Sequence, residues 1–202
     1  MSGFTAADLA AAAARIAPVA AASADELNAL DGQLGDGDLG ITVSKGWAEA
    51  AAAELPADLG QAFLALAKAF QRASSSSFGT LVATGFMAAA KATKGREEAG
   101  WDEVGALLSA ARDAMMARGK GALGDKSVLD VLDAAAEAAS GKAEPGAILS
   151  AVDQATDQAL EAFRDRPNRL GRARMFGERS QGLDDPGMRA FRRILDGLVA
   201  DR

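Results

Sequence analysis

The amino-acid sequence predicts an all-α fold in a single domain that covers residues 1–202. Three observations indicate this fold class. Alanine is very abundant and favours the helix, because it loses no side-chain entropy there. Proline, which breaks helices, is scarce at 5 residues of 202. Apolar residues recur at spacings of three and four, whereas no convincing strand, sequence repeat or interdomain linker can be recognised.

Eight helices are expected. The first begins at Thr5, a suitable N-cap with Asp8 three residues later, and runs to about residue 30. Pro18 should bend or divide it. The third starts near Asp58 and ends at the serine run 74–77. The other six are expected at about 41–54, 78–91, 101–116, 126–140 and 145–163, and from just after Pro186 onward.

Glycine-rich segments connect these helices at residues 32–40, 118–124 and 167–185, after the first, fifth and seventh helix. The serine run 74–77 follows the third. In an up-and-down bundle, the loops that follow odd-numbered helices emerge at the same end. We therefore expect these four segments to lie together, and we expect function at that end because connecting loops carry most binding residues.

The composition excludes several kinds of active site. The chain contains no His, no Tyr and no Cys. Ser-His-Asp triads, His-ligated zinc or haem, thiol catalysis and disulfides all need residues that are absent. The remaining Asp, Glu, Ser, Thr, Lys and Arg side chains suit a hard, oxygen-binding cation and phosphate groups.

Neither a membrane nor a nucleic acid is expected as a partner. No run of 18 or more strongly apolar residues is present, and the first nine residues lack the pattern of a signal peptide. A cytoplasmic location is the resulting expectation, and the absence of cysteine agrees with it. The net charge of −6 argues against nucleic-acid binding, and the basic segment is short and poor in aromatic residues.

Charge is distributed unevenly along the chain. Residues 1–60 carry nine acidic and two basic side chains, whereas residues 164–202 carry six acidic and ten basic ones. The two ends can therefore form two halves of one site, with carboxylates for cations and guanidinium groups for phosphates. A solvated surface with ion pairs between distant parts of the chain explains the same distribution.

The segment LDGQLGDGDLG, whose residues 31–40 are called the aspartate loop below, places Asp31, Asp36 and Asp38 within eight positions among four glycines. Gly37 allows a sharp turn that can direct Asp36 and Asp38 at one ion. Mg²⁺ prefers carboxylate oxygens together with phosphate and water, so the segment predicts a magnesium site. No glutamate follows at the closing position of an EF-hand, which argues against a calcium loop. A polar turn whose aspartates only cap helices is the alternative.

Three further segments have a pattern typical of anion sites, and each has a structural alternative. Hydroxyls and free amides at residues 74–80 precede a helix, where they can bind phosphate or only cap the helix. Residues 119–127 follow the same pattern, although Lys126 can equally be an ordinary surface residue. Residues 177–187 place Arg179 before a helix that begins near Pro186, which fits either a nucleotide contact or a tight turn.

Four motifs, in this order, resemble the L subunit of dihydroxyacetone kinases (the DhaL type): GDGDLG, SSSSFGT, GDKSVLD and GERSQGLDDPG. The resemblance covers nearly the whole chain. It implies an eight-helix antiparallel up-and-down barrel with the nucleotide site at one end. It also implies that Asp31, Asp36 and Asp38 bind two Mg²⁺ ions that bridge the phosphates of ADP or ATP. The residues implied to surround the nucleotide are Leu39, Gly40, Ile41, Thr42, Ser76, Ser77, Gly119, Val128, Arg179, Asp185, Pro186 and Gly187.

The same resemblance implies one subunit of a multi-subunit kinase of glycerol metabolism. The family's separate K-type subunit holds a ketose covalently on a histidine, and this chain has no histidine. Some family members use ATP directly, and in others a phosphotransferase-system M-type subunit recharges bound ADP. Leu39 stands where the family usually has His, Ser127 where it has Thr, and Val128 where it has Met. The metal ligands are intact, and the acceptor is dihydroxyacetone or a related ketose or sugar alcohol.

Two other functions fit the same sequence. Leu39 is compatible with a catalytically silent Mg-nucleotide-binding regulatory module. A helical module with an incidental acidic turn would bind no nucleotide at all. A kinase relative with an acceptor domain of its own would need more than 202 residues.

Overall fold

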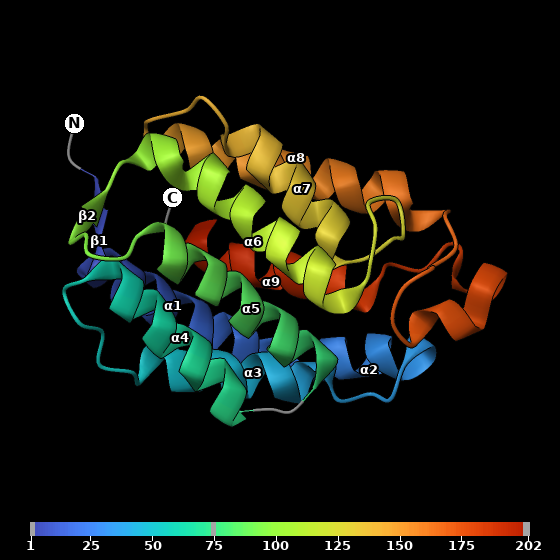
Figure 1. Ribbon diagram of the computed structural model, residues 1–202. Helices are drawn as coiled ribbons and strands as arrows, with labels where there is room; N and C mark the ends of the chain where they lie inside the picture. The colour runs from blue at the N-terminus through green and yellow to red at the C-terminus, as the bar shows by residue number, and fades with distance from the viewer. Residues whose placement is uncertain (1–2, 74–75, 200–202) are drawn as a thin grey trace.

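The computed structural model describes residues 3–73 and 76–199, and helices dominate this part of the chain (Figure 1). The all-α prediction is confirmed. The described α-helices are α1 Ala6–Ala22, α2 Ala24–Leu34, α3 Leu39–Ala51, α4 Leu59–Ala73, α5 Ser77–Ala92, α6 Val104–Gly119, α7 Val128–Ala139, α8 Pro145–Arg164 and α9 Pro186–Val199. Two 3₁₀ helices, η1 Trp101–Glu103 and η2 Ala173–Ser180, and two short strands, β1 Phe4–Thr5 and β2 Glu98–Ala99, complete the described elements.

The expected first helix is two helices, and the break lies at Ser23 rather than at Pro18, which lies inside α1. The Ser23 hydroxyl donates a hydrogen bond to the Val19 carbonyl oxygen at 2.8 Å, and the Ser23 amide donates to the same oxygen at 3.0 Å. A serine hydroxyl competes in this way with the backbone bonds of a helix. This break accounts for the ninth described α-helix, where eight were expected.

The connection between α2 and α3 is shorter than expected. α2 continues to Leu34, so Asp31 and Gly32 are helical, and α3 already begins at Leu39. The glycine-rich segment expected at residues 32–40 therefore reduces to a true loop of residues 35–38. Two of the three predicted metal ligands consequently stand at helix ends, where their backbone positions are well defined.

α7 begins at Val128, two residues later than expected. Ser127 Oγ accepts a hydrogen bond from the Leu129 amide at 3.2 Å, and Asp130 Oδ2 accepts one from the Ser127 amide at 2.8 Å. This reciprocal capping fixes the first turn of the helix. Lys126 therefore belongs to the preceding loop, not to the helix.

The strands were not expected from the sequence. β1 and β2 pair antiparallel, with Phe4 opposite Ala99 and Thr5 opposite Glu98. Phe4 also packs on Trp101, with ring centroids 5.5 Å apart. Two-residue strands are too short for an alternating pattern, so only the packed structure shows them.

The helices pack on their neighbours along the chain, and the last helix returns to the first. α3, α4, α5, α6 and α7 each contact the next in order, and α9 contacts α1, α7 and α8. Trp47 of α3 lies at the centre of an aromatic cluster, with ring centroids 5.4 Å from that of Phe70 and 6.2 Å from that of Phe86. Figure 1 shows the two strands at one end of the bundle, and the loops of residues 35–38 and 120–127 with η2 at the other.

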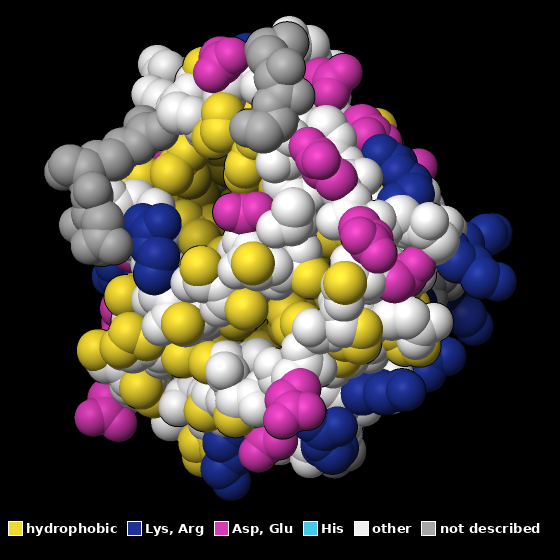
Figure 2. Space-filling model, turned by 90° about the vertical axis from the view of Figure 1, so that its left-hand side faces the viewer, with side chains coloured by type: hydrophobic (Ala, Val, Ile, Leu, Met, Phe, Trp, Pro, Cys, Tyr) yellow, Lys and Arg dark blue, Asp and Glu magenta, His cyan; other side chains and the backbone are white. Residues whose placement is uncertain are grey.

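Figure 2 views the end that holds the strands, where hydrophobic side chains surround a hollow and charged side chains lie around them.

Within residues 3–73 and 76–199, no single helix is long and apolar enough to cross a membrane. α1 and α2 meet the length and composition required only as a pair, across a bend of 63°.

α9 approaches α1 closely at Gly197, where a side chain would collide with backbone. A Cβ at this position would lie 2.7 Å from Ile16 Cα and 3.2 Å from the Arg15 carbonyl oxygen. Gly197→Ala should therefore lower the free energy of unfolding by about 1–2 kcal/mol, since overpacking outweighs the gain in helix propensity. Urea unfolding measures the change. In the control Gly32→Ala, the Cβ would meet nothing nearer than Gly37 Cα at 3.9 Å, so an equal loss of stability there would contradict the packing argument.

Candidate functional site

The three aspartates of the aspartate loop come together. Asp31 lies in the last turn of α2, and Asp38 directly precedes α3. One carboxylate oxygen from each of Asp31, Asp36 and Asp38 lies within 4.8 Å of the others. Asp31 Oδ2 accepts hydrogen bonds from the amides of Gly37 at 2.9 Å and Asp38 at 3.1 Å. Gly37 has a φ of +78°, a left-handed conformation that glycine adopts without strain.

The charges of these aspartates act on one another. Burial raises the pKa of Asp38 above its ordinary value, and the negative charges of Asp36 and Asp31 raise it further. The Arg172 guanidinium, which forms an ion pair with Asp36, lowers it. Carboxylates that repel one another at this separation are the donor set that a hard divalent cation requires. The side chains present therefore fit Mg²⁺.

Asn28 of α2 organises the start of α3. Its Oδ1 accepts hydrogen bonds from the amides of Gly40 at 2.8 Å and Ile41 at 3.2 Å. A Cβ on Gly40 would lie 1.9 Å from the Ala24 carbonyl oxygen, so only glycine fits at this crossing of α2 and α3. The amides of Gly40 and Ile41, which were expected near the nucleotide, therefore donate to the Asn28 side chain. Asn28 was not predicted from the sequence. Its only signal there is its position, three residues before Asp31 on the same helix, α2.

The N-termini of α3 and α5 meet. Thr42 Oγ1 donates a hydrogen bond to Ser76 Oγ at 3.1 Å, and Ser76 Oγ accepts one from the Gly79 amide at 3.1 Å, which caps α5. Ser77 is exposed as the first residue of α5. The other serines of the run, Ser74 and Ser75, lie outside the described residues. Both helix N-termini direct the positive ends of their dipoles to this end of the molecule.

Lys126 is buried, so the interpretation of the sequence that made it an ordinary surface residue is wrong. Its side chain is completely buried, and its Nζ donates hydrogen bonds to the carbonyl oxygens of Arg164, Arg166 and Ser180, each at 2.8 Å. Burial lowers the pKa of this amine below its ordinary value, and nearby carboxylates, first of them Asp185, oppose the shift. The GDKS motif therefore uses its lysine inside the protein.

Asp185 is buried too, and it caps α9. Its Oδ1 accepts a hydrogen bond from the Met188 amide at 2.9 Å, and its Oδ2 accepts one from Asn168 Nδ2 at 2.7 Å. Burial raises the pKa of Asp185 to about 7, against the effect of these hydrogen bonds and of the Lys126 charge. Asn168, which the sequence analysis also missed, links this carboxylate to the loop before α7, since its Nδ2 donates to the Lys126 carbonyl oxygen at 2.8 Å.

The remaining predicted nucleotide contacts lie around the same end. A Cβ on Gly187 would lie 3.3 Å from Val128 Cβ, so the turn after Asp185 touches the first residue of α7. Pro186 is the first residue of α9. Gly119 ends α6 beside α5, where an added Cβ would lie 3.3 Å from Leu81 Cδ2. Leu39 is buried in the hydrophobic core, and Arg179 is exposed on η2.

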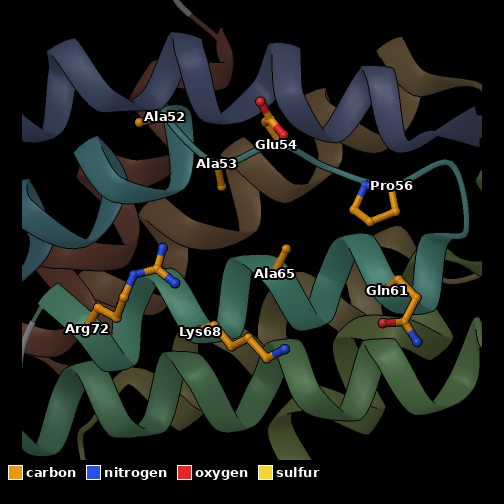
Figure 3. Close-up of a pocket in the computed structure, with 8 residues that line it drawn as sticks. All are labelled: Ala52, Ala53, Glu54, Pro56, Gln61, Ala65, Lys68 and Arg72. Atoms are coloured by element: carbon orange, nitrogen blue, oxygen red, sulfur yellow. The ribbon is translucent and has the colours of Figure 1, made fainter.

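The hollow in Figure 3 lies apart from these loops. It has a volume of about 440 Å³ and opens between the segment that leaves α3 and one side of α4. Its lining residues are Ala52, Ala53, Glu54, Pro56, Gln61, Ala65, Lys68 and Arg72, none of which belongs to the predicted site. Arg72 pairs with Glu49 at 3.6 Å. The charged residues that line the hollow, Glu54, Lys68 and Arg72, do not form a cluster of metal ligands. The aspartate loop therefore remains the better candidate for the functional site.

Comparisons with known proteins agree with the motifs. Residues 33–200 match the model of the DAK2 domain family. The chain is 28% identical over 181 residues to the ADP-binding subunit DhaL of the PEP-dependent dihydroxyacetone kinase of Escherichia coli (strain K12), a match that covers 86% of each chain. It is 33% identical over 184 residues to L-erythrulose 1-kinase of Mycolicibacterium smegmatis, which covers 86% of this chain and 32% of that one. Triokinase/FMN cyclase of Rattus norvegicus is 32% identical over 189 residues, again 86% of this chain and 32% of the relative.

Two crystal structures share the fold. Both are dihydroxyacetone kinase from C. freundii, one described as a complex with AMP-PNP and Mg²⁺ and one as the native form. They cover all of this chain, with TM-scores of 0.73 and 0.77 and identities of 21% and 22%. This chain corresponds to about a third of their length, at 35% and 36%. The predicted resemblance and the predicted enzyme class, a kinase that works as part of a larger enzyme, are confirmed.

Proposed function

The chain belongs to the DAK2 domain family, and from this membership we propose that it is the nucleotide-binding subunit of a dihydroxyacetone-type kinase. It binds Mg-ADP or Mg-ATP on the aspartate loop and transfers a phosphoryl group to a ketose held by a separate K-type subunit. The observation that carries this proposal is the approach of three carboxylates within 4.8 Å, at the end where the N-termini of α3 and α5 meet.

The aspartates have distinct tasks in this proposal. Asp31 holds the loop in shape through the amides of Gly37 and Asp38, and its other oxygen remains available to a cation. Asp36 is exposed, as is Asp38, and it shares its charge with Arg172. Two bound Mg²⁺ ions would neutralise the phosphate charges and the charge that develops in phosphoryl transfer. The chain's own contribution is to fix the carboxylates before the nucleotide arrives.

The nucleotide would lie over the four helix N-termini at this end. The proposed contacts are Leu39, Gly40, Ile41, Thr42, Ser76, Ser77, Gly119, Val128, Arg179, Asp185, Pro186 and Gly187. The first residues of α3, α5, α7 and α9 are among them, and their positive dipole ends favour phosphate oxygens. Because Asp185 is buried as the cap of α9, its contribution is to shape the turn at Gly187 rather than to offer a free carboxylate.

The acceptor and the source of the phosphoryl group come from the partners. The chain has no histidine to hold a ketone covalently, so a K-type subunit presents the substrate. The relatives from Escherichia coli and Listeria innocua are named PEP-dependent, which suggests that an M-type phosphotransferase subunit recharges bound ADP. The similarity to L-erythrulose 1-kinase makes a four-carbon ketose an alternative acceptor to dihydroxyacetone.

One observation supports a second candidate function. Leu39 stands where the family usually has His, and its side chain is buried among the core residues around Val43 and Trp47. A leucine side chain has no polar group to offer the nucleotide. A catalytically silent Mg-nucleotide-binding regulatory module is consistent with this change, and it would bind nucleotide without phosphorylating any ketose.

Mg-ADP should stabilise the chain if the proposed function is correct. At about 100 times its dissociation constant, the ligand adds about 2.7 kcal/mol, which corresponds to a rise of roughly 5–10 °C in Tm for a domain of this size. Differential scanning calorimetry with Mg-ADP measures the rise, and ADP with EDTA is the control. A melting temperature that Mg-ADP leaves unchanged would contradict both nucleotide-binding functions.

A further inference from the structure

The buried lysine of the GDKS motif connects three distant points of the chain. Lys126 Nζ donates to the carbonyl oxygens of Arg164, the last residue of α8, of Arg166, two residues beyond it, and of Ser180, the last residue of η2. An ammonium group has three protons to donate, and these three contacts use all of them. Lys126 therefore has no donor left for a phosphate, although a lysine in a glycine-rich loop would usually be assigned to one.

Four further hydrogen bonds hold the same part of the chain together. The Asn168 amide donates to Ser180 Oγ at 2.8 Å, and Asn168 Nδ2 donates both to the Lys126 carbonyl oxygen and to Asp185 Oδ2. The Arg169 amide donates to the Asp125 carbonyl oxygen at 2.8 Å. Together with the three bonds of Lys126, these contacts form what is called the clasp below. The clasp holds both ends of residues 164–180 against the loop before α7.

The segment held by the clasp carries Arg172, the arginine that contacts the aspartate loop. Six arginines occur between residues 164 and 179. Arg172 forms an ion pair with Asp36, and Arg179 lies exposed on η2. Apart from η2, this segment has no regular structure of its own, so its position depends on contacts with other parts of the chain.

We propose that Lys126 is a positioning residue: through the clasp it holds the arginine-bearing segment 164–180 over the aspartate loop, where the arginines meet the phosphates. Its predicted effect on nucleotide affinity rests on the proposed function, whereas its effect on the segment does not. Burying an ammonium group is costly unless every proton is bonded. Lys126→Met replaces the aliphatic part of the side chain with one of similar length but removes the ammonium group and all three bonds, so the ends of the segment should detach.

The first experiment is limited trypsin proteolysis of the nucleotide-free protein, with cleavage sites identified by mass spectrometry. Lys126→Met should accelerate cleavage after the arginines of residues 164–179 on the order of tenfold, because local opening exposes them. Asn168→Ala removes the other donor side chain of the clasp and should give the same cleavage pattern. Arg192→Met is the matched control, since Arg192 is also a buried cation, but it pairs with Asp153, Asp157 and Asp196, away from the candidate site.

The second experiment is calorimetric titration of the same variants with Mg-ADP and with Mg²⁺ alone. Lys126→Met should weaken Mg-ADP binding on the order of tenfold, because the arginines are no longer held in place. Mg²⁺ alone should bind equally well or more tightly, because a loosened Arg172 no longer opposes it at Asp36. A general loss of structure would weaken the binding of both Mg-ADP and Mg²⁺. Comparison of the two affinities therefore distinguishes a loss of arginine positioning from a loss of overall stability.

Two results would overturn the proposal. One is a trypsin pattern of Lys126→Met and Asn168→Ala that equals the pattern of Arg192→Met. The other is a loss of Mg-ADP affinity in Lys126→Met no larger than that in Arg192→Met. If the wild-type chain itself binds no Mg-ADP, the proposed function fails instead, and the cleavage pattern still decides whether Lys126 holds the segment.

Discussion

Asp36→Asn should nearly abolish Mg²⁺-dependent binding of ADP or ATP. The change removes a negative charge and a ligand oxygen but keeps the size of the side chain. Within the described residues, Asp36 forms an ion pair with the Arg172 guanidinium on the surface and, unlike Asp31, accepts no hydrogen bond from the loop backbone. The loop should therefore keep its shape. We expect affinity for Mg-ADP to fall on the order of a hundredfold or more, as when one partner of a close charge pair is removed.

Calorimetric titration with and without EDTA measures this loss. Asp25→Asn is the matched control, because Asp25 is an exposed acid in the first turn of α2, the helix before the loop that holds Asp36, and lies outside the aspartate loop. It removes the same charge from the molecule without touching the site. Unchanged affinity in Asp36→Asn, or equal losses in the two variants, would remove the basis for placing the metal on these aspartates.

Ketose phosphorylation should require a second protein. The chain alone, with Mg-ATP and dihydroxyacetone or a four-carbon ketose, should turn over at background rate, because the chain has no histidine to hold a ketone covalently. Addition of the cognate K-type subunit should raise the rate on the order of a thousandfold or more, since it brings the acceptor into line with the nucleotide. A coupled assay that detects the ketose phosphate measures this difference. If recharging depends on an M-type subunit, ADP-loaded chain should need that subunit and PEP as well.

The docking surface should be the rim around Asp31, Ser76, Gly119 and Arg179, since the phosphates must face the substrate. Arg179→Glu should weaken assembly with the K-type subunit. Arg15→Glu is the control and should not weaken it, because Arg15 of α1 lies beside Leu198, near the C-terminal end of α9 and away from this rim. Robust ketose phosphorylation by the isolated chain would contradict the need for a partner, and an acceptor site would then have to lie within these 202 residues. Nucleotide binding without phosphorylation in the complete system would favour the silent regulatory module.

Much of the fold follows from local patterns in the sequence. The spacing of Leu59, Phe63, Leu66 and Phe70 predicts α4, because a helical period is a property of neighbouring residues. The aspartate loop was likewise recognisable, since Asp31, Asp36 and Asp38 lie within eight positions with glycines between them. The expectation that the four connecting segments meet at one end needed only the alternation of helix direction.

Only the tertiary structure decided how the site is held. The partners of Lys126 lie 38, 40 and 54 positions away, so no local pattern distinguishes this buried lysine from a surface one. The same holds for Arg172, whose ion pair with Asp36 joins the two ends of the chain. Local sequence thus determined the helices and indicated the three aspartates that come together in the folded chain. Long-range packing determined which polar groups bind one another and so which remain available to a ligand, because each such bond depends on segments that approach only in the folded chain.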